Sequence, residues 1–241
     1  MPHEKGHHPG AIWRKADLQC HSPRDQGWIQ PPSLPGGTPE YEKARDDWAA
    51  SFIAECRTRN LELVSITDHH DMTFVPYVVK AAASDKFTLA LPGVEVTCND
   101  NTQCLVLFDP AVPAAIWTHF LGKLKGVTQG SANEAKVTKA INANVSIKEL
   151  FDDVIGDKVL RDVCVMLPHF SDPQAHKSLN EQGHHERFAS IECDGVYIEK
   201  PFSELDKGTK EKAYGEIPDW GTRHAEPSSR LETTRRRRGT G

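Results

Sequence analysis

Ile66-Thr67-Asp68-His69-His70-Asp71 is the stretch that decides the fold, because two acids and two histidines directly follow a short apolar run. That run, residues 61–67, has the β-branched and apolar composition of a β-strand. Such a cluster at a strand end favours a metal or catalytic site over an ordinary polar loop. His69 is the stronger ligand candidate, whereas His70 is either a neighbour of the site or simply exposed.

Three further stretches repeat the pattern of an acid or a histidine at or near the end of an apolar run. Asp17-Leu18-Gln19-Cys20-His21 closes a strand expected over 12–20, and positions 17, 19 and 21 share one face of it. Gly93-Val94-Glu95 puts a carboxylate in an apolar strand, where an unpaired charge is costly. Pro168-His169 ends a strand expected over 163–167. Ligands gathered from successive strand ends are typical of a barrel-like α/β metal enzyme.

Each of these three stretches also has an ordinary structural interpretation. Asp17, Gln19 and His21 fit the polar side of a surface strand. Glu95 can be neutralised by one of the arginines instead of a cation, and a single histidine such as His169 is often structural. The metal interpretation gains its weight from the four stretches taken together.

Helical and strand patterns alternate along the chain, which predicts α/β architecture. Apolar side chains recur at helical spacing after Thr38 and Pro39, which suit an N-cap and a first helical position, and Asn60 suits the end of that helix. Ser146 and Glu149 form the pattern of a capping box. The other expected helices are 72–84, 113–124 and 147–155. The other expected strands are 87–97, which contains a strand ending at Glu95, then 104–108 and 195–199.

Composition limits the class of protein. A chain of 241 residues fits one large α/β domain, and the net charge of −5 argues against nucleic-acid binding through bulk charge, although a local basic cleft is compatible with it. No apolar run approaches the roughly 20 residues of a membrane helix. The six cysteines are scattered without a C-x-x-C pair, which indicates a reduced, cytoplasmic location.

Three segments look different from the rest. Residues 1–11 are polar and lack the apolar core of a signal peptide, so we expect a disordered N-terminus. Residues 126–146 are polar and small, which predicts a surface insertion. Residues 221–241 include four consecutive arginines and are expected to form a basic, disordered tail, with nucleic-acid binding as the functional alternative.

The order of the motifs, Asp-Leu-x-x-His, Thr-Asp-His, Gly-x-Glu and Pro-His, resembles the PHP family (polymerase and histidinol phosphatase). The Trp13-Arg-Lys-Ala-Asp-Leu-Gln opening and Ser22-Pro23-Arg24-Asp25 most resemble the PHP modules in front of SMC-like ATPase domains, the TrlF type. The resemblance covers about 12–200. It implies a PHP-like domain over 12–220 with a distorted (β/α)7 barrel and two or three divalent metal ions, zinc, manganese or iron. The implied reaction is hydrolysis of a phosphomonoester or a nucleic-acid phosphodiester.

The resemblance also implies roles for particular residues. His21 matches the second histidine of the family's opening His-x-His, Asp68 and His69 match the second motif, Glu95 matches the bridging carboxylate, and His169 matches the Pro-His histidine. These histidines and Glu95 would hold the metal, while Asp68 would orient a histidine or join the ligands.

Two residues beside these motifs have further expected roles. Asp25 falls near the acid or histidine that follows the opening motif, so it would ligate metal or handle a proton. Arg24 would grip a phosphate through two parallel hydrogen bonds.

The chain also departs from the family pattern. Gln19 stands where the first histidine of His-x-His is expected, and an amide is a weaker ligand than imidazole for zinc-like metals. Gln103 stands roughly where another ligand histidine is expected, and no Asp-x-His follows His169. These departures support the alternative of a degenerate, non-catalytic module that binds nucleic acid or regulates a partner ATPase. They also raise the hypothesis that the chain is truncated or out of frame beyond about Trp220.

Overall fold

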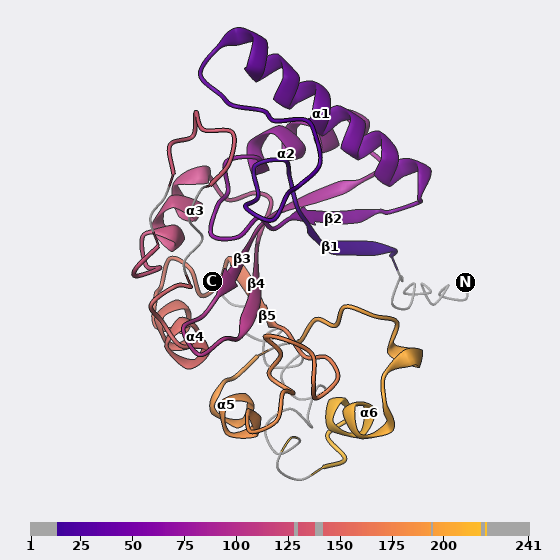
Figure 1. Ribbon diagram of the computed structural model, residues 1–241, viewed down its shortest axis with the longest axis vertical. Coiled ribbons are helices and arrows are strands. Elements are labelled where there is room, and N and C mark those ends of the chain that lie inside the picture. Colours follow the sequence, from indigo (N-terminus) through magenta and orange to yellow (C-terminus); the bar gives the residue numbers. More distant parts are fainter. Residues whose placement is uncertain (1–13, 128–129, 138–141, 194, 218–219, 221–241) are drawn as a thin grey trace, which may run out of the picture.

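The computed structural model describes residues 14–127, 130–137, 142–193, 195–217 and 220. Within these residues the chain forms mixed α/β structure with a five-stranded sheet in the order β1-β2-β3-β4-β5 (Figure 1). The strands are β1 (Ala16–Cys20), β2 (Leu63–Ile66), β3 (Leu89–Thr97), β4 (Gln103–Phe108) and β5 (Cys164–Pro168). The helices are α1 (Pro39–Thr58), α2 (Val75–Asp85), α3 (Ala114–Leu121), α4 (Ile147–Ile155), α5 (His185–Ser190), the 3₁₀-helix η1 (Phe202–Glu204) and α6 (Lys207–Ala213).

The α/β prediction is therefore confirmed. The sheet has a parallel part and an antiparallel part: β1, β2 and β3 are parallel neighbours, whereas β4 runs against both β3 and β5. Consequently β5 runs in the same direction as β1–β3, and its end faces the same edge of the sheet as theirs. Among the described residues β1 and β5 stand at opposite ends of the strand order, and no pairing between them closes a barrel.

The prediction of a strand over 195–199 was wrong in its length. The described part of this stretch forms only an isolated parallel bridge, between Tyr197 and His169. Two backbone hydrogen bonds hold it, from Tyr197 N to Pro168 O at 3.1 Å and from Phe170 N to Tyr197 O at 2.8 Å. The segment therefore lies beside the end of β5 but pairs there only briefly.

The predicted helix caps are confirmed. The Thr38 side chain accepts a hydrogen bond from Tyr41 N, and Pro39 is the first residue of α1. Asn60 has a φ of 57°, in the left-handed region that suits a residue just past a helix end. The α4 capping box between Ser146 and Glu149 is complete.

Helix α2 begins at Val75, three residues later than expected. The Asp71 carboxylate accepts hydrogen bonds from Thr73 N at 2.9 Å and Thr73 Oγ1 at 3.2 Å. This local turn competes with helix formation, because a short acidic side chain offers the backbone another partner. Pro76 then falls in the first turn of the helix, where its missing N–H costs nothing.

Two hydrophobic clusters hold the elements together. One joins α1 and α2 to β2 and to the start of β3, and the other joins β3, β4 and β5 to α3, α4 and α5. Every residue of β4 is buried, as expected of a central strand covered on both faces. Cys56, Cys98 and Cys104 lie in these clusters and act as small apolar side chains.

Other predicted segments are described only in part or not at all. Ala143 and Val145 in the segment 126–146 are buried, and Ala143 N donates to Thr97 O at 2.8 Å, so part of this segment packs beside the end of β3. The predicted disordered ends, 1–11 and 221–241, lie outside the described residues. None of the described helices has the length and apolar character needed to cross a membrane.

Candidate metal centre

The three parallel strands bring polar side chains from distant parts of the sequence to one edge of the sheet. His21 follows β1, while Asp68 and His69 follow β2. Glu95 lies near the end of β3 and forms a parallel bridge with His69. Glu95 N also donates to Asp68 O at 3.2 Å. These backbone contacts fix which side chains lie opposite one another.

Gly93 leaves room for side chains of the neighbouring strand at this edge. A Cβ atom at position 93 would lie 2.1 Å from Ser65 Oγ and 2.9 Å from Thr67 Cγ2. Any side chain at this position would collide with the side chains of Ser65 and Thr67, so these would have to shift. This explains in physical terms why glycine precedes the glutamate of the Gly-Val-Glu stretch.

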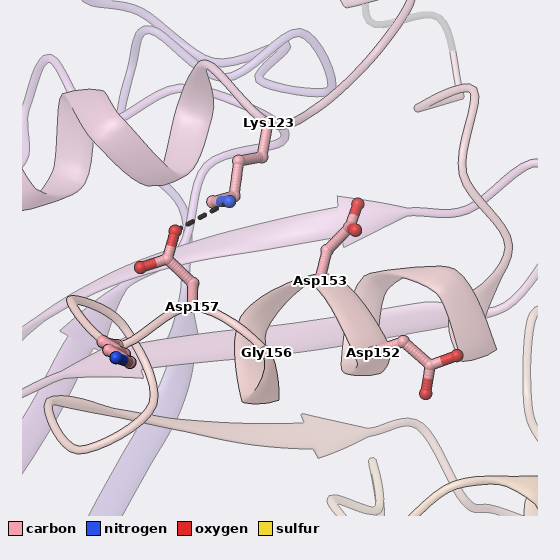
Figure 2. Close-up of a pocket in the computed structure, with 6 residues that line it drawn as sticks. Lys123, Asp152, Asp153, Gly156 and Asp157 are labelled. Atoms are coloured by element: carbon pink, nitrogen blue, oxygen red, sulfur yellow. Dashed lines mark ion pairs between the residues drawn. The ribbon is translucent and has the colours of Figure 1, made fainter.

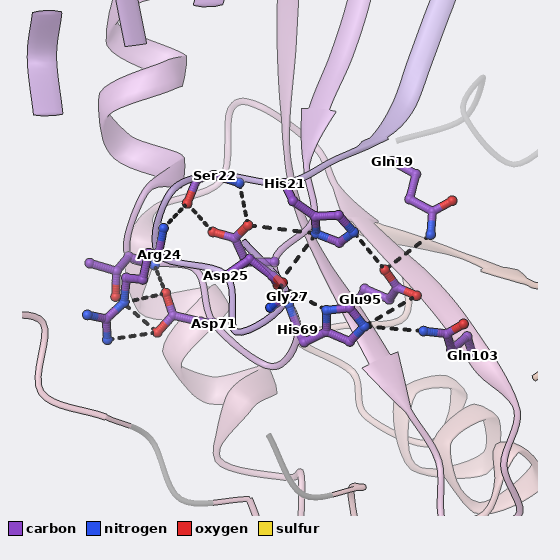
Figure 3. A network of polar contacts seen from close by, with 12 residues as sticks. Gln19, His21, Ser22, Arg24, Asp25, Gly27, His69, Asp71, Glu95 and Gln103 are labelled. Carbon is purple, nitrogen blue, oxygen red and sulfur yellow. Dashed lines mark hydrogen bonds and ion pairs between the residues drawn. The ribbon is translucent and has the colours of Figure 1, made fainter. Parts of the chain in front are cut away.

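Five of the predicted site residues come together in two overlapping groups (Figure 3). One group consists of His21, His69 and Glu95, and the other of His21, Asp25 and Asp68. In each group the candidate ligand atoms lie within 4.8 Å of one another. Imidazole nitrogens and carboxylate oxygens at this spacing are a suitable donor set for a divalent transition metal.

Asp25 holds His69 in a defined orientation. Its Oδ2 atom accepts hydrogen bonds from His69 N at 2.8 Å and from His69 Nδ1 at 2.9 Å. Burial alone would raise the pKa of Asp25, but these bonds outweigh it and lower the pKa to about 2. Burial lowers the pKa of His69, but the bond to Asp25 and the charge of Glu95 outweigh it, so that pKa is raised overall.

Asp68 is fully buried and is held by Ser22, in the loop that follows β1. Its two oxygens accept hydrogen bonds from Ser22 N at 2.7 Å and from Ser22 Oγ at 2.5 Å. Burial raises the pKa of Asp68 to about 8 despite these two bonds. Asp68 therefore belongs to a candidate ligand group and is anchored by Ser22, and no histidine hydrogen-bonds to its carboxylate among the described residues.

Two buried polar atoms at the centre of the site, Glu95 Oε1 and His21 Nδ1, lack hydrogen-bond partners among the described residues. His21 Nδ1 lies 3.5 Å from Asp25 Oδ2, and His21 Nε2 lies 3.6 Å from Glu95 Oε2. A buried polar atom without a partner is costly. A cation held by His21, His69 and Glu95 would satisfy Glu95 Oε1, and one held by His21, Asp25 and Asp68 would satisfy His21 Nδ1. The residues present therefore fit a divalent metal ion.

Two glutamines border the cluster. Gln19 Nε2 lies 3.2 Å from Glu95 Oε2, and Gln103 Nε2 lies 3.2 Å from His69 Nε2 (Figure 3). Gln19 and Gln103, which replace histidines expected from the resemblance, therefore contact the atoms that would bind a cation.

His169 lies at the same edge but outside both ligand groups. It is fully buried, it stacks on Tyr197 with ring centroids 4.8 Å apart, and its Nε2 lies 3.7 Å from Glu199 Oε1. Its backbone N donates to Gln103 O at 2.9 Å, which places it beside β4. Burial lowers the pKa of His169.

Arg24 was predicted to bind a substrate phosphate, but the structure pairs its guanidinium with another residue. Its guanidinium is fully buried and bonds both oxygens of Asp71, with Nε–Oδ1 at 2.9 Å and Nη2–Oδ2 at 3.1 Å. A third bond reaches Glu134 O at 2.5 Å. Arg24 thus ties the loop after β1 to the loop after β2. The motif at 66–71 includes Asp71, but the sequence alone does not predict that Asp71 pairs with Arg24.

His70 is buried and supports the site from behind. Its Nε2 accepts a hydrogen bond from Thr97 N at 2.9 Å, and its backbone φ is 54°. Burial lowers its pKa to about 4, so the ring is neutral. Of the two interpretations of His70, a neighbour of the site is therefore the correct one.

A separate surface pocket of about 580 Å³ lies at the end of α4 (Figure 2). It is lined by Lys123, Asp152, Asp153, Gly156, Asp157 and Lys158. Asp157 pairs with Lys123 at 2.7 Å and with His119 at 2.8 Å, and these bonds lower its pKa. None of the residues that line this pocket was a predicted site residue.

Comparison with known proteins gives only distant similarities. No protein-family profile and no curated protein matches the chain. A candidate metal-dependent phosphoesterase from Bifidobacterium adolescentis is 13% identical, with a TM-score of 0.49 and coverage of 90% of each chain. An amidohydrolase from Chromobacterium violaceum, solved with bound sulfate and no metal, is 22% identical with a TM-score of 0.27, over 46% of this chain and 33% of that one. The functional assignment therefore rests on the geometry of the site.

Proposed function

We propose that this chain is a metal-dependent hydrolase of phosphoesters, acting on a phosphomonoester or a phosphodiester, including a nucleic-acid backbone. The observation that carries the proposal is the pair of ligand groups that share His21. Buried Glu95 Oε1, which has no hydrogen-bond partner among the described residues, supports it further. The order of the motifs supports a PHP-type domain related to the TrlF modules, with the five strands forming part of a distorted (β/α)7 barrel.

The two ring nitrogens of His21 face different groups, with Nε2 towards Glu95 and Nδ1 towards Asp25 and Asp68. A neutral imidazole has one lone pair for a metal, so His21 serves one group at a time. We place the first cation with His21, His69 and Glu95. Zinc, manganese and iron all suit such a mixed nitrogen and oxygen set.

A divalent cation held there would supply Lewis acidity towards a phosphoryl oxygen and would lower the pKa of a coordinated water molecule. The protein's own contribution is orientation. Asp25 fixes a proton on His69 Nδ1 and thereby leaves Nε2 as the ligand atom, and such partners of ligating histidines tune metal affinity.

Lys177 is our proposed contact for the substrate phosphate, because Arg24 is already paired. Its carbonyl accepts a hydrogen bond from Gln103 N at 3.0 Å, beside the site. Its positive charge lowers the pKa values of His69 and His70, which indicates that the charge lies near them. Replacing Lys177 with methionine should raise KM without weakening metal binding, because it removes a positive charge near the proposed cation site.

The test of the proposed function combines metal content with activity. Protein purified without a chelator should contain zinc, manganese or iron by elemental analysis, and should hydrolyse p-nitrophenyl phosphate or bis(p-nitrophenyl) phosphate. The variant His69→Ala should lose both metal and hydrolysis with an unchanged circular dichroism spectrum. His119→Ala, at an exposed histidine on α3, is the matched control. No bound metal and no gain in hydrolysis with Mn²⁺ or Zn²⁺ would contradict the proposal.

The second candidate is a non-catalytic module that binds nucleic acid or regulates a partner ATPase. The observation that favours it is the position of Gln19 and Gln103, whose amides lie against Glu95 and His69. Under this alternative, salt-sensitive DNA binding should persist in EDTA and in the variant His69→Ala.

A further inference from the structure

A chain of hydrogen bonds fixes the proton positions at His69. Asp25 Oδ2 receives both His69 N at 2.8 Å and His69 Nδ1 at 2.9 Å. An ionised carboxylate can only accept, so Nδ1 carries the proton and Nε2 of the neutral ring has only a lone pair. Gln103 Nε2 lies 3.2 Å from His69 Nε2, which carries that lone pair. The amide of Gln103 must therefore donate its N–H to His69 Nε2.

The same reasoning fixes Gln19. Its amide nitrogen lies 3.2 Å from Glu95 Oε2, which can only accept when Glu95 is ionised. Turning the amide around would set its oxygen against the carboxylate oxygen, and two acceptors repel. Each glutamine thus donates to a different ligand atom of the same group, one on Glu95 and one on His69 (Figure 3).

We infer that Gln19 and Gln103 compete with the cation for Glu95 Oε2 and His69 Nε2, and so weaken metal binding. The inference rests on the proposed metal centre. The only lone pair of His69 Nε2 accepts the N–H of Gln103, so a cation must displace Gln103 before it can bind that atom. At Glu95 Oε2, the N–H of Gln19 occupies one of two lone pairs and weakens what that oxygen offers a cation. The glutamines are therefore positioning residues that set the cation concentration at which the site fills.

If the glutamines were metal ligands instead, removing them would change the metal affinity in the opposite direction. If either amide turned and offered its oxygen to the cation, the glutamine would be a ligand and its loss would weaken binding. Competition predicts that loss of the glutamine strengthens binding. The sign of the change in affinity separates the two roles.

The experiment measures Mn²⁺ binding to the full chain by calorimetry, in the protein and in the variants Gln19→Met and Gln103→Met. Methionine keeps the approximate length of glutamine but has no N–H, and its soft sulfur is a poor ligand for Mn²⁺. Each variant should bind Mn²⁺ roughly two- to tenfold more tightly, which corresponds to one hydrogen bond of ordinary strength. Gln30→Met, at an exposed glutamine outside both ligand groups, should leave the affinity unchanged.

Weaker or unchanged binding in both site variants would overturn the inference while leaving the proposed function intact. Absence of Mn²⁺ binding from every protein tested would overturn both together. A second measurement does not depend on metal. ¹⁵N NMR of the chelator-treated protein, recorded well above the pH at which histidine titrates, should show the His69 proton on Nδ1. A proton on Nε2 would contradict the inference by itself.

Discussion

The ends of β1, β2 and β3 and the end of β5 face the same edge of the sheet, yet they organise their polar side chains differently. At the parallel strands, neighbouring ends place His21, His69 and Glu95 in one ligand group. At β5, His169 is separated from Glu95 by the width of β4, and it stacks on Tyr197 instead of joining a group. Strand direction alone therefore does not assemble a site; adjacency within the sheet decides which side chains can share a cation.

The two regions also differ in how their loops are tied. The loops after β1 and β2 are joined by the buried ion pair of Arg24 and Asp71. Removing one partner of a buried pair leaves an unpaired charge, so Arg24→Ala should lower the free energy of unfolding by about 3–5 kcal/mol. Chemical denaturation measures this effect, which is the largest we expect.

The matched control for Arg24 is Arg57, whose side chain is 60% exposed and pairs with Asp85 at 3.0 Å. Arg57→Ala should cost no more than about 1 kcal/mol, because exposed ion pairs contribute little. Equal losses in the two variants would show that burial of the Arg24 pair does not matter.

Sequence reasoning succeeded where the decisive information is local. Strand-end motifs, the Thr38 cap and the Ser146 capping box each depend on residues a few positions apart, and the structure has all of them. The parallel strands then brought Asp68, His69 and Glu95 together, because ends of neighbouring parallel strands necessarily meet.

Sequence reasoning fell short where the outcome depends on tertiary pairing. Arg24 looked available for phosphate because nothing local reveals that Asp71 occupies both arms of its guanidinium. The stretch around Tyr197 has an apolar pattern, but the length of a strand depends on its neighbour, and here only one bridge forms. The acceptors that face the two glutamine amides, Glu95 Oε2 and His69 Nε2, likewise cannot be identified from the sequence.

The second largest effect we expect directly tests the contrast between the two regions. His69→Ala should weaken Mn²⁺ binding by on the order of a hundredfold or more, since even partners of ligands contribute up to that amount. His169→Ala should change the affinity by less than about threefold, because His169 lies outside both groups. Calorimetric titration of the two variants measures this. Comparable losses would place His169 among the ligands and remove the distinction.

A smaller effect is expected from the residue that orients His69. Asp25→Asn keeps the shape of the side chain but removes its charge and one strong acceptor, so Mn²⁺ affinity should fall about tenfold. Asp47→Asn, at an exposed acid on α1, should leave it unchanged. An unchanged affinity in Asp25→Asn would mean that the two hydrogen bonds to His69 do not set its ligand strength.

The smallest effect concerns the antiparallel region, where α4 packs in the hydrophobic cluster with β4 and β5. Ser146 accepts a hydrogen bond from Glu149 N at 3.2 Å, and loss of such a cap costs about 1 kcal/mol of stability. Ser146→Ala should therefore lower the free energy of unfolding by that amount and leave Mn²⁺ affinity as it was. Ser51→Ala, at an exposed position within α1, should cause no loss, because alanine is the better helix former. If Ser146→Ala also weakened Mn²⁺ binding, the antiparallel region would be coupled to the metal centre more tightly than its contacts indicate.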